Sequence, residues 1–204
     1  MLVLPVTVRI PSAGEMPDRP DLEELLLKRE KANIREGFTM RPNTTRQLPF
    51  SFYADININN PRLWDLLEAL SKQLPEEVCC VYGLDATEQV MTEYFPKAVV
   101  WQKLTPYRLE LTADCFIEFG LVHHSRNRLT EILVTASKYI SYCGSDREAF
   151  FQCMKDFELP EIAGLAFIDE YPKIVEPLKL FVPAARQPEE VIRLLDRSFN
   201  VERE

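Results

Sequence analysis

Glycine is scarce in this chain, and the few glycines that it has are far apart. Six occur among 204 residues, namely Gly14, Gly37, Gly83, Gly120, Gly144 and Gly164. A loop that cradles a nucleotide phosphate needs clustered glycines, as in G-x-G-x-x-G or the P-loop, because the backbone must approach the phosphate closely. The sequence therefore disfavours a dinucleotide-dependent enzyme and an NTPase of these classes.

Residues with the spacing of a metal site are also missing. The two histidines, His123 and His124, are adjacent, and no C-x-x-C pair occurs. Cys79 and Cys80 fall in a predicted strand, where neighbouring side chains point to opposite faces, so a single ion does not reach both. We expect no metal, no cofactor and free buried thiols in a reducing compartment. The cysteines are Cys79, Cys80, Cys115, Cys143 and Cys153.

Long apolar runs and an excess of basic residues are absent as well. The apolar stretch at residues 2–10 is short and lacks the basic region and small-residue cleavage site of a signal peptide. No run approaches the roughly 20 residues of a transmembrane helix. Acidic residues outnumber basic ones by 32 to 24, a net charge of −8, which disfavours a general nucleic-acid binder. We expect a cytoplasmic protein that binds neither nucleic acid nor membrane.

The front of the chain has little apolar mass of its own. Residues 2–10 alternate as in a strand, residues 21–35 have the apolar spacing of a helix, and residues 36–47 form a polar connector. We therefore expect residues 1–47 to form an N-terminal arm packed on a single α+β body, residues 48–204.

A strand–helix–strand unit is predicted early in the body. Residues 50–58 have the pattern of a strand, and Asn60 caps the helix that follows. Leu74-Pro75 ends this helix, since a residue before proline is disfavoured in the α region. A second strand is expected over residues 78–84.

The same order of a strand, a capped helix and a Leu-Pro helix stop recurs 85 residues later. A strand over 138–143 precedes a helix in which Ser145 and Glu148 form a capping box. This helix ends at Leu159-Pro160, and a strand is expected over 165–168. We therefore expect a duplicated unit over about 50–84 and 135–169; helix stops of this kind are common, so coincidence is the alternative.

The remaining segments complete the predicted fold. The strands 115–122 and 129–136 flank a turn and indicate a β-hairpin. Strands interrupted by hairpins indicate an α+β fold with a mixed or mainly antiparallel sheet and about four or five helices. The other expected elements are helices over 85–95 and 188–199 and strands over 96–103, 107–111 and 174–182.

The histidine pair at the tip of this hairpin is the strongest catalytic candidate. Histidine is the usual general base near neutral pH, and His123 or His124 with Cys115 or Ser125 would make a hydrolase. The alternative is that both are solvated turn residues. We favour this alternative, because no G-x-S-x-G motif surrounds any serine, and we therefore favour a non-catalytic role over an enzyme.

Acidic residues follow the second strand of each predicted unit. Asp85 comes after the first, and Asp169, Glu170 and Tyr171 come after the second. If the duplication is real, these residues lie at equivalent ends of the two units and face the same way. Such a patch suits a basic protein partner, because complementary charge speeds association.

Part of the body resembles a known class of proteins. The segment Phe116–Thr135, the Leu159-Pro-Glu helix stop and Phe167–Pro172 resemble bacterial immunity proteins of polymorphic and contact-dependent toxin systems. The resemblance covers roughly residues 48–175 and includes no family signature, so it assigns no site residue. It implies an inhibitor that binds one toxin and occludes its active site.

Three functions therefore remain open. The chain is an immunity-type inhibitor, an accessory or structural subunit whose polar arm orders on a larger assembly, or a hydrolase that uses His123 or His124.

Overall fold

The fold is built on one antiparallel sheet. The computed structural model describes residues 2–15, 21–45, 47–85, 87 and 89–202. The strand order is β2-β3-β9-β8-β7-β4-β5, and β6 also pairs with β4. All of these pairings are antiparallel, which confirms the predicted α+β class. The strands are β2 (Gly37–Pro42), β3 (Phe52–Asn57), β4 (Glu77–Leu84), β5 (Val90–Met91), β6 (Phe95–Pro96), β7 (Ile117–Ser125), β8 (Arg128–Val134) and β9 (Ile140–Gly144).

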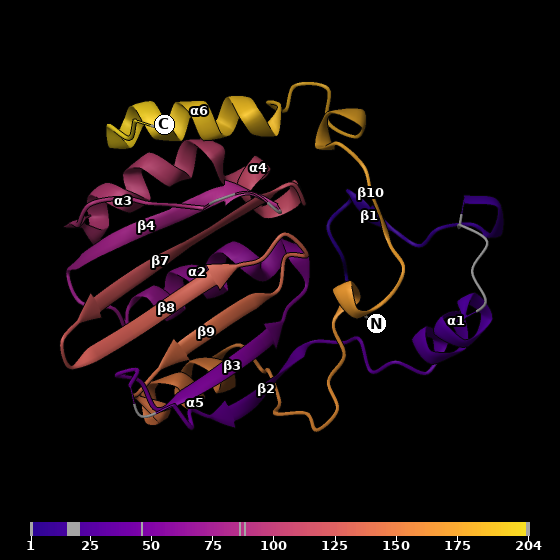
Figure 1. The fold of residues 1–204 in the computed structure, drawn as a ribbon, viewed down its shortest axis with the longest axis horizontal. Helices are drawn as coiled ribbons and strands as arrows, with labels where there is room; N and C mark the ends of the chain where they lie inside the picture. The colour runs from indigo at the N-terminus through magenta and orange to yellow at the C-terminus, as the bar shows by residue number, and fades with distance from the viewer. Residues whose placement is uncertain (1, 16–20, 46, 86, 88, 203–204) are drawn as a thin grey trace.

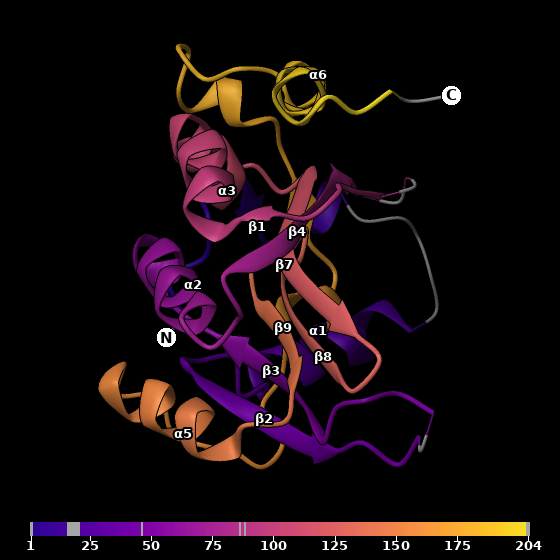
Figure 2. The ribbon, with the colours of Figure 1, turned by 90° about the vertical axis from the view of Figure 1, so that its left-hand side faces the viewer.

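Helices lie on one face of this sheet, as Figure 2 shows for α2, α3 and α5. Apolar side chains alternate toward them along each strand; in β3, Phe52, Ala54 and Ile56 are almost fully buried. Burial of a large apolar side chain such as Phe52 or Ile56 contributes about 1.5–3 kcal/mol to stability. This layer contains the main core. The helices are α2 (Leu63–Ser71), α3 (Lys97–Leu104), α4 (Arg108–Ala113), α5 (Arg147–Asp156) and α6 (Pro188–Phe199).

No helix of the described residues lies on the opposite face. Figure 1 looks onto this face, and α2 is seen behind the strands. α6 packs at the β4 end of the helical layer, where its Phe199 stacks on Tyr82 of β4. The sheet is therefore covered on one side only, which an antiparallel sheet tolerates when its other side is partly polar.

The first part of the predicted N-terminal arm lies beside the sheet in Figure 1, whereas β2, within the same predicted segment 1–47, is a strand of the sheet itself. β1 (Val8–Arg9) pairs with β10 (Ile174–Val175) in a separate two-stranded ladder, and α1 (Leu22–Glu30) follows. The strands expected over 2–10 and 174–182 are thus only two residues long each. Thr7, just before β1, donates its hydroxyl to the carbonyl of Ala113, and Pro177 begins a 3-10 turn soon after β10.

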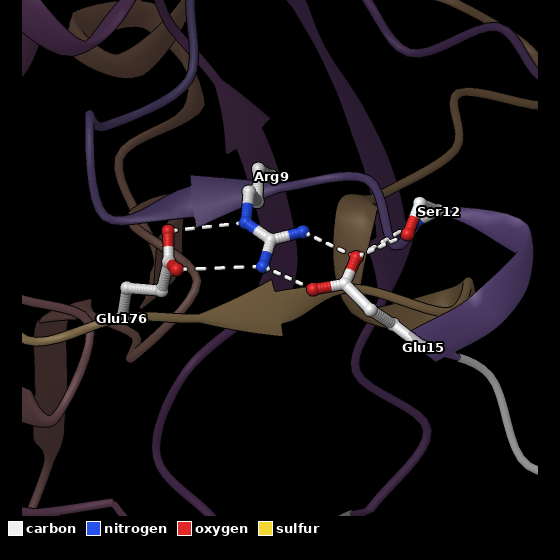
Figure 3. A network of polar contacts seen from close by, with 4 residues as sticks. All are labelled: Arg9, Ser12, Glu15 and Glu176. Carbon is white, nitrogen blue, oxygen red and sulfur yellow. Dashed lines mark hydrogen bonds and ion pairs between the residues drawn. The ribbon is translucent and has the colours of Figure 1, made fainter.

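An arginine fastens this small ladder, as Figure 3 shows. The guanidinium of Arg9 donates to both carboxylate oxygens of Glu15, at 2.6 and 2.8 Å, and to Glu176 at 3.1 Å. Glu15 also accepts from the backbone N–H and the hydroxyl of Ser12. Hydrogen bonds with Arg9 lower the pKa of Glu15, and the two carboxylates raise the pKa of Arg9. The Arg9 side chain therefore joins β1 to the turn that contains Glu15 and to the end of β10.

Several predicted elements are wrong in type. Residues 36–47, expected to form a connector, contain β2, whose Phe38 enters the core. Residues 85–95, expected as a helix, contain β5, and residues 96–103 form α3 instead of a strand. Residues 107–111, also expected as a strand, lie mostly in α4. Tertiary packing decides these segments, because α3 buries Val100 and Leu104, four residues apart, against the core.

The predicted duplication holds for the strand and the helix of each unit and fails after the second helix stop. Residues 165–168, expected as a strand, are coil that runs into a 3-10 turn at Ile168–Glu170. Before this coil, Glu161 forms an isolated parallel bridge with Phe38 of β2. The reason is local packing, since Leu165 and Phe167 join a small apolar cluster with Ile162 instead of extending the sheet.

The helix caps also differ from those predicted. Asp146, and not Ser145, caps α5 by accepting from the backbone N–H of Ala149 at 3.0 Å. Asn60 begins a 3-10 turn that leads into α2, and its side chain donates to the carbonyl of Thr112. The asparagine therefore connects α2 to α4.

Candidate functional site

The structure separates the residues of the hydrolase hypothesis. His123 and His124 lie near the end of β7, and Cys115 lies just before its start. Eight residues of extended chain separate Cys115 from His123, roughly 25 Å. Cys115 is buried, and burial raises the pKa of its thiol. These residues therefore do not form a Cys–His pair.

The two rings also have separate surroundings. His123 Nδ1 lies 3.0 Å from the carbonyl oxygen of Glu77, and its ring packs edge-to-face on Tyr94. His124 is exposed, and its backbone exchanges hydrogen bonds with the Tyr94 hydroxyl. Among the described contacts, no acid, serine or cysteine side chain bonds to either ring. The arrangement is that of a strand end held by Tyr94.

The acidic residues predicted to bind a partner lie around one end of the sheet. Asp85 follows β4, and its N–H donates to the carbonyl of Phe116 before β7. Asp169 is exposed beside Tyr139, which precedes β9, and burial together with the charge of Asp169 raises the pKa of that tyrosine. Glu170 is used internally, because its carboxylate accepts from the N–H of Phe167. Tyr171, next to Glu170, is half-buried.

A buried polar group lies beneath this end. Lys138 is 3% exposed, with a positive φ of 61°, and its ammonium donates to the carbonyl of Ile117. Burial lowers the pKa of Lys138 to about 8, against the pull of Cys115, Asp114, Glu118 and Asp85. Lys138 therefore supports the start of β7 electrostatically.

Asp114 belongs to this group. It is 1% exposed, and its Oδ1 accepts from the N–H of Phe116 at 3.0 Å. Within the described residues its Oδ2 has no hydrogen-bond partner, and burial raises the pKa of the carboxyl group. Lys138 is the nearby opposite charge, so the pair fits a structural role in this turn.

The face without helices presents side chains that strand pairing aligns in rows. One row crosses six strands, and a second row, two residues further along, crosses seven. Because side chains two residues apart share a face, both rows point away from the core. The first row is Cys79, Val122, Glu131, Cys143, Tyr53 and Arg41. The second is Met91, Val81, Gly120, Leu133, Ser141, Asp55 and Thr39. We call these two rows the open face.

Glu131 stands near the middle of the open face. Its cross-strand neighbours are Val122 on β7 and Cys143 on β9, and its neighbours along β8 on the same face are Leu129 and Leu133. The side chain is half-buried, and burial raises the pKa of its carboxyl group. No hydrogen bond or ion pair to it is found in the part of the chain that the structure describes.

The other charges of the open face lie toward its edge. Asp55 is 3.8 Å from the mostly exposed Arg41, a weak pair across β3 and β2. Arg41 also lies over the ring of Tyr53, 5.2 Å from its centroid. The centre of the face is therefore apolar with one unpaired acid.

The open face was not predicted from the sequence, although the apolar residues on both sides of β8 indicate it. One side of β8 has Ile132 and Val134, and the other has Leu129, Glu131 and Leu133. A strand that is apolar on both sides and interrupted by one acid indicates a second packing surface.

Other kinds of site find little support. No group of three or more potential metal ligands occurs among the described His, Cys, Asp and Glu residues. None of the described helices is long and apolar enough to span a membrane. A hollow of about 810 Å³ lies between the segment that contains β1 and the segment that contains α1, with Leu4, Val8, Leu26 and Ile34 among its lining residues.

Comparison with protein-family models, curated proteins and solved structures found no match. The geometry of the open face therefore carries the functional argument alone.

Proposed function

We propose that this chain is a non-catalytic, protein-binding protein of the immunity type, which binds a partner toxin and occludes it. The observation that carries the proposal is the open face, a broad sheet surface that none of the described helices covers. Half-buried Val81 and Leu133 lie on it among carboxylates, and half-buried Leu129 lies beside its rows. Apolar surface of this kind, with polar groups around it, marks protein interaction sites.

The dimensions of the face suit a protein partner. Seven strands spaced about 4.8 Å apart span roughly 29 Å, and five residues along a strand span about 17 Å. The flat area is on the order of 500 Å², less than the roughly 800 Å² that each partner buries in a standard interface, so residues around the two rows would have to contribute. A flat surface of this size is suited to a protein and poorly suited to a small molecule, which needs a concave pocket.

The charge of the face and of the chain favours a basic partner. Glu131 and Asp55 lie on the two rows, and Arg41 is the cation of those rows. The chain as a whole carries a net charge of −8. Complementary charge would speed association with a basic toxin domain and disfavour phosphate-rich partners.

The experiment is co-expression of this chain in bacteria with the product of the gene next to its own. We expect that product to stop growth alone, and we expect this chain to restore growth and form a 1:1 complex. The association rate should fall as salt concentration rises. A harmless neighbouring product, or a toxic one that this chain neither binds nor neutralises, would contradict the proposal.

A second candidate function is an accessory subunit of a larger assembly. One observation favours it: the arm exposes the apolar residues Val3, Val6, Ile10 and Leu27, each about half exposed. A partner that covers the arm would bury them. Limited proteolysis of the free chain should then cleave within residues 11–36, before β2, and the assembly should protect this segment.

A further inference from the structure

We propose that Glu131 is the recognition point of the open face and binds an arginine of the partner, which enters between apolar side chains. This inference rests on the proposed function and names the chemistry of the contact. It begins from the position of the carboxylate, enclosed by Val122, Leu129, Leu133 and Cys143.

The first step concerns the cost of covering this carboxylate. Glu131 is already half-buried, and the loss of water raises the pKa of its carboxyl group. A partner seated on Leu129 and Leu133 would remove the remaining water. An ionised carboxylate without a partner is unfavourable in such surroundings, so a stable complex must supply a cation or hydrogen-bond donors.

The second step concerns which cation fits. A guanidinium offers two parallel donors to a carboxylate and stacks on aromatic rings, whereas an ammonium does neither as well. Tyr53 lies two strands from Glu131 in the same row, and its ring already carries the guanidinium of Arg41. Arginine is also the cation enriched in the desolvated centres of interfaces.

The third step concerns the alternative that a second copy of this chain covers the face. A symmetric pair would bring two negatively charged faces together, each with Glu131 and Asp55. Each chain also carries a net charge of −8. Like charges at an interface are unfavourable, so a partner with the opposite charge is favoured.

The last step concerns orientation. The half-buried Leu129 and Leu133 flank Glu131 along β8, one on each side, whereas its cross-strand neighbours Val122 and Cys143 are buried. An arginine at Glu131 would therefore be flanked by apolar side chains of the partner on both sides. The expected partner surface is a basic residue within an apolar patch.

The test selects random peptides displayed on phage against the full chain, immobilised at neutral pH. We expect the enriched peptides to share an arginine flanked by apolar residues. Their affinity should fall roughly tenfold or more for Glu131→Gln and stay unchanged for Glu76→Gln, an exposed acid in the turn between α2 and β4. Circular dichroism and thermal melting establish that both variants are folded.

Three outcomes would overturn the inference: no enrichment of arginine, equal binding to wild type and Glu131→Gln, or a homodimer in solution that Leu133→Lys dissociates. The proposed function fails separately. If the neighbouring toxin binds Glu131→Gln as tightly as wild type, the recognition point is wrong and the inhibitor role stands. If no toxin binds wild type while arginine peptides bind through Glu131, the inhibitor role is wrong and the recognition point stands.

Discussion

Glu131 and Cys143 are cross-strand partners on β8 and β9, on the face of the sheet that no helix covers. Burial and the neighbouring Glu131 carboxylate together raise the pKa of Cys143 to about 12. The thiol is therefore protonated at neutral pH, where only the thiolate is a strong nucleophile. A catalytic role for Cys143 does not fit these surroundings.

This relationship predicts the reactivity of the thiol. Glu131→Gln removes the negative charge beside Cys143, so the pKa of Cys143 falls and more thiolate forms at a given pH. Alkylation of Cys143 by iodoacetamide, followed by peptide mass spectrometry at mildly alkaline pH, should be faster in Glu131→Gln than in wild type. Glu76→Gln is the control and should leave the rate unchanged. Equal rates in all three proteins would contradict the coupling.

The same substitution should stabilise the fold. Burial raises the pKa of Glu131, so its ionised form is disfavoured in the folded state at neutral pH. Glu131→Gln should increase the free energy of unfolding at pH 7 by about 0.5–1 kcal/mol, within the range common for a single stabilising substitution. Urea denaturation measures this change. A loss of stability would mean that the carboxylate has a supporting partner in the folded chain.

Lys138 predicts a pH dependence of stability. Burial lowers the pKa of Lys138 from 10.5 to about 8, so between these values the unfolded chain binds the extra proton. Stability from this group therefore rises with pH across the window, by roughly 3 kcal/mol in total. In urea denaturation, the stability of Lys138→Met relative to wild type should be greatest below pH 8 and should shrink toward pH 10.5. Parallel pH profiles of the two proteins would show that Lys138 is not desolvated.

The cap of α5 gives a prediction that distinguishes two adjacent residues. Asp146 accepts from the N–H of Ala149, whereas Ser145 is exposed before the helix. Asp146→Ala should cost about 1 kcal/mol of unfolding free energy, and Ser145→Ala should change it by less than about 0.5 kcal/mol. Thermal melting of both variants measures the difference. A larger loss for Ser145→Ala would restore the capping box expected from the sequence.

Local signals were enough to predict some elements. α6 has Pro188 at its start and Val191, Ile192 and Leu195 on its buried side, and its observed bounds match the predicted range. Asn200 then ends the helix in a left-handed conformation, with φ of 56°. Such elements carry their own start, stop and buried stripe within a dozen residues.

Other elements depend on contacts that no local pattern contains. β5 and β6 are two residues long, too short for any periodicity, and they form because β4 offers an edge. α3 carries Val99, Val100 and Trp101, which resemble a strand until Trp101 packs edge-to-face on Trp64 of α2. Tertiary packing overrides propensity in these segments.

The open face depends on register and layering. Both sides of β8 are apolar, with Ile132 on one side and Leu133 on the other. Register places Glu131 on the same side as Leu133, and only the placement of the helices decides which side of the sheet stays uncovered. The acidic residues around Asp85 and Asp169 were the sequence's own candidates for binding a partner, and that assignment stays a prediction.

The most direct test of the central claim is the affinity of the protein encoded beside this chain's gene, the proposed toxin, for wild type, Glu131→Gln, Leu133→Lys and Glu76→Gln, measured by surface plasmon resonance. The account predicts that Glu131→Gln and Leu133→Lys each weaken binding by about tenfold or more, about 1.4 kcal/mol, with Glu76→Gln equal to wild type. Unchanged affinity in both open-face variants would contradict it.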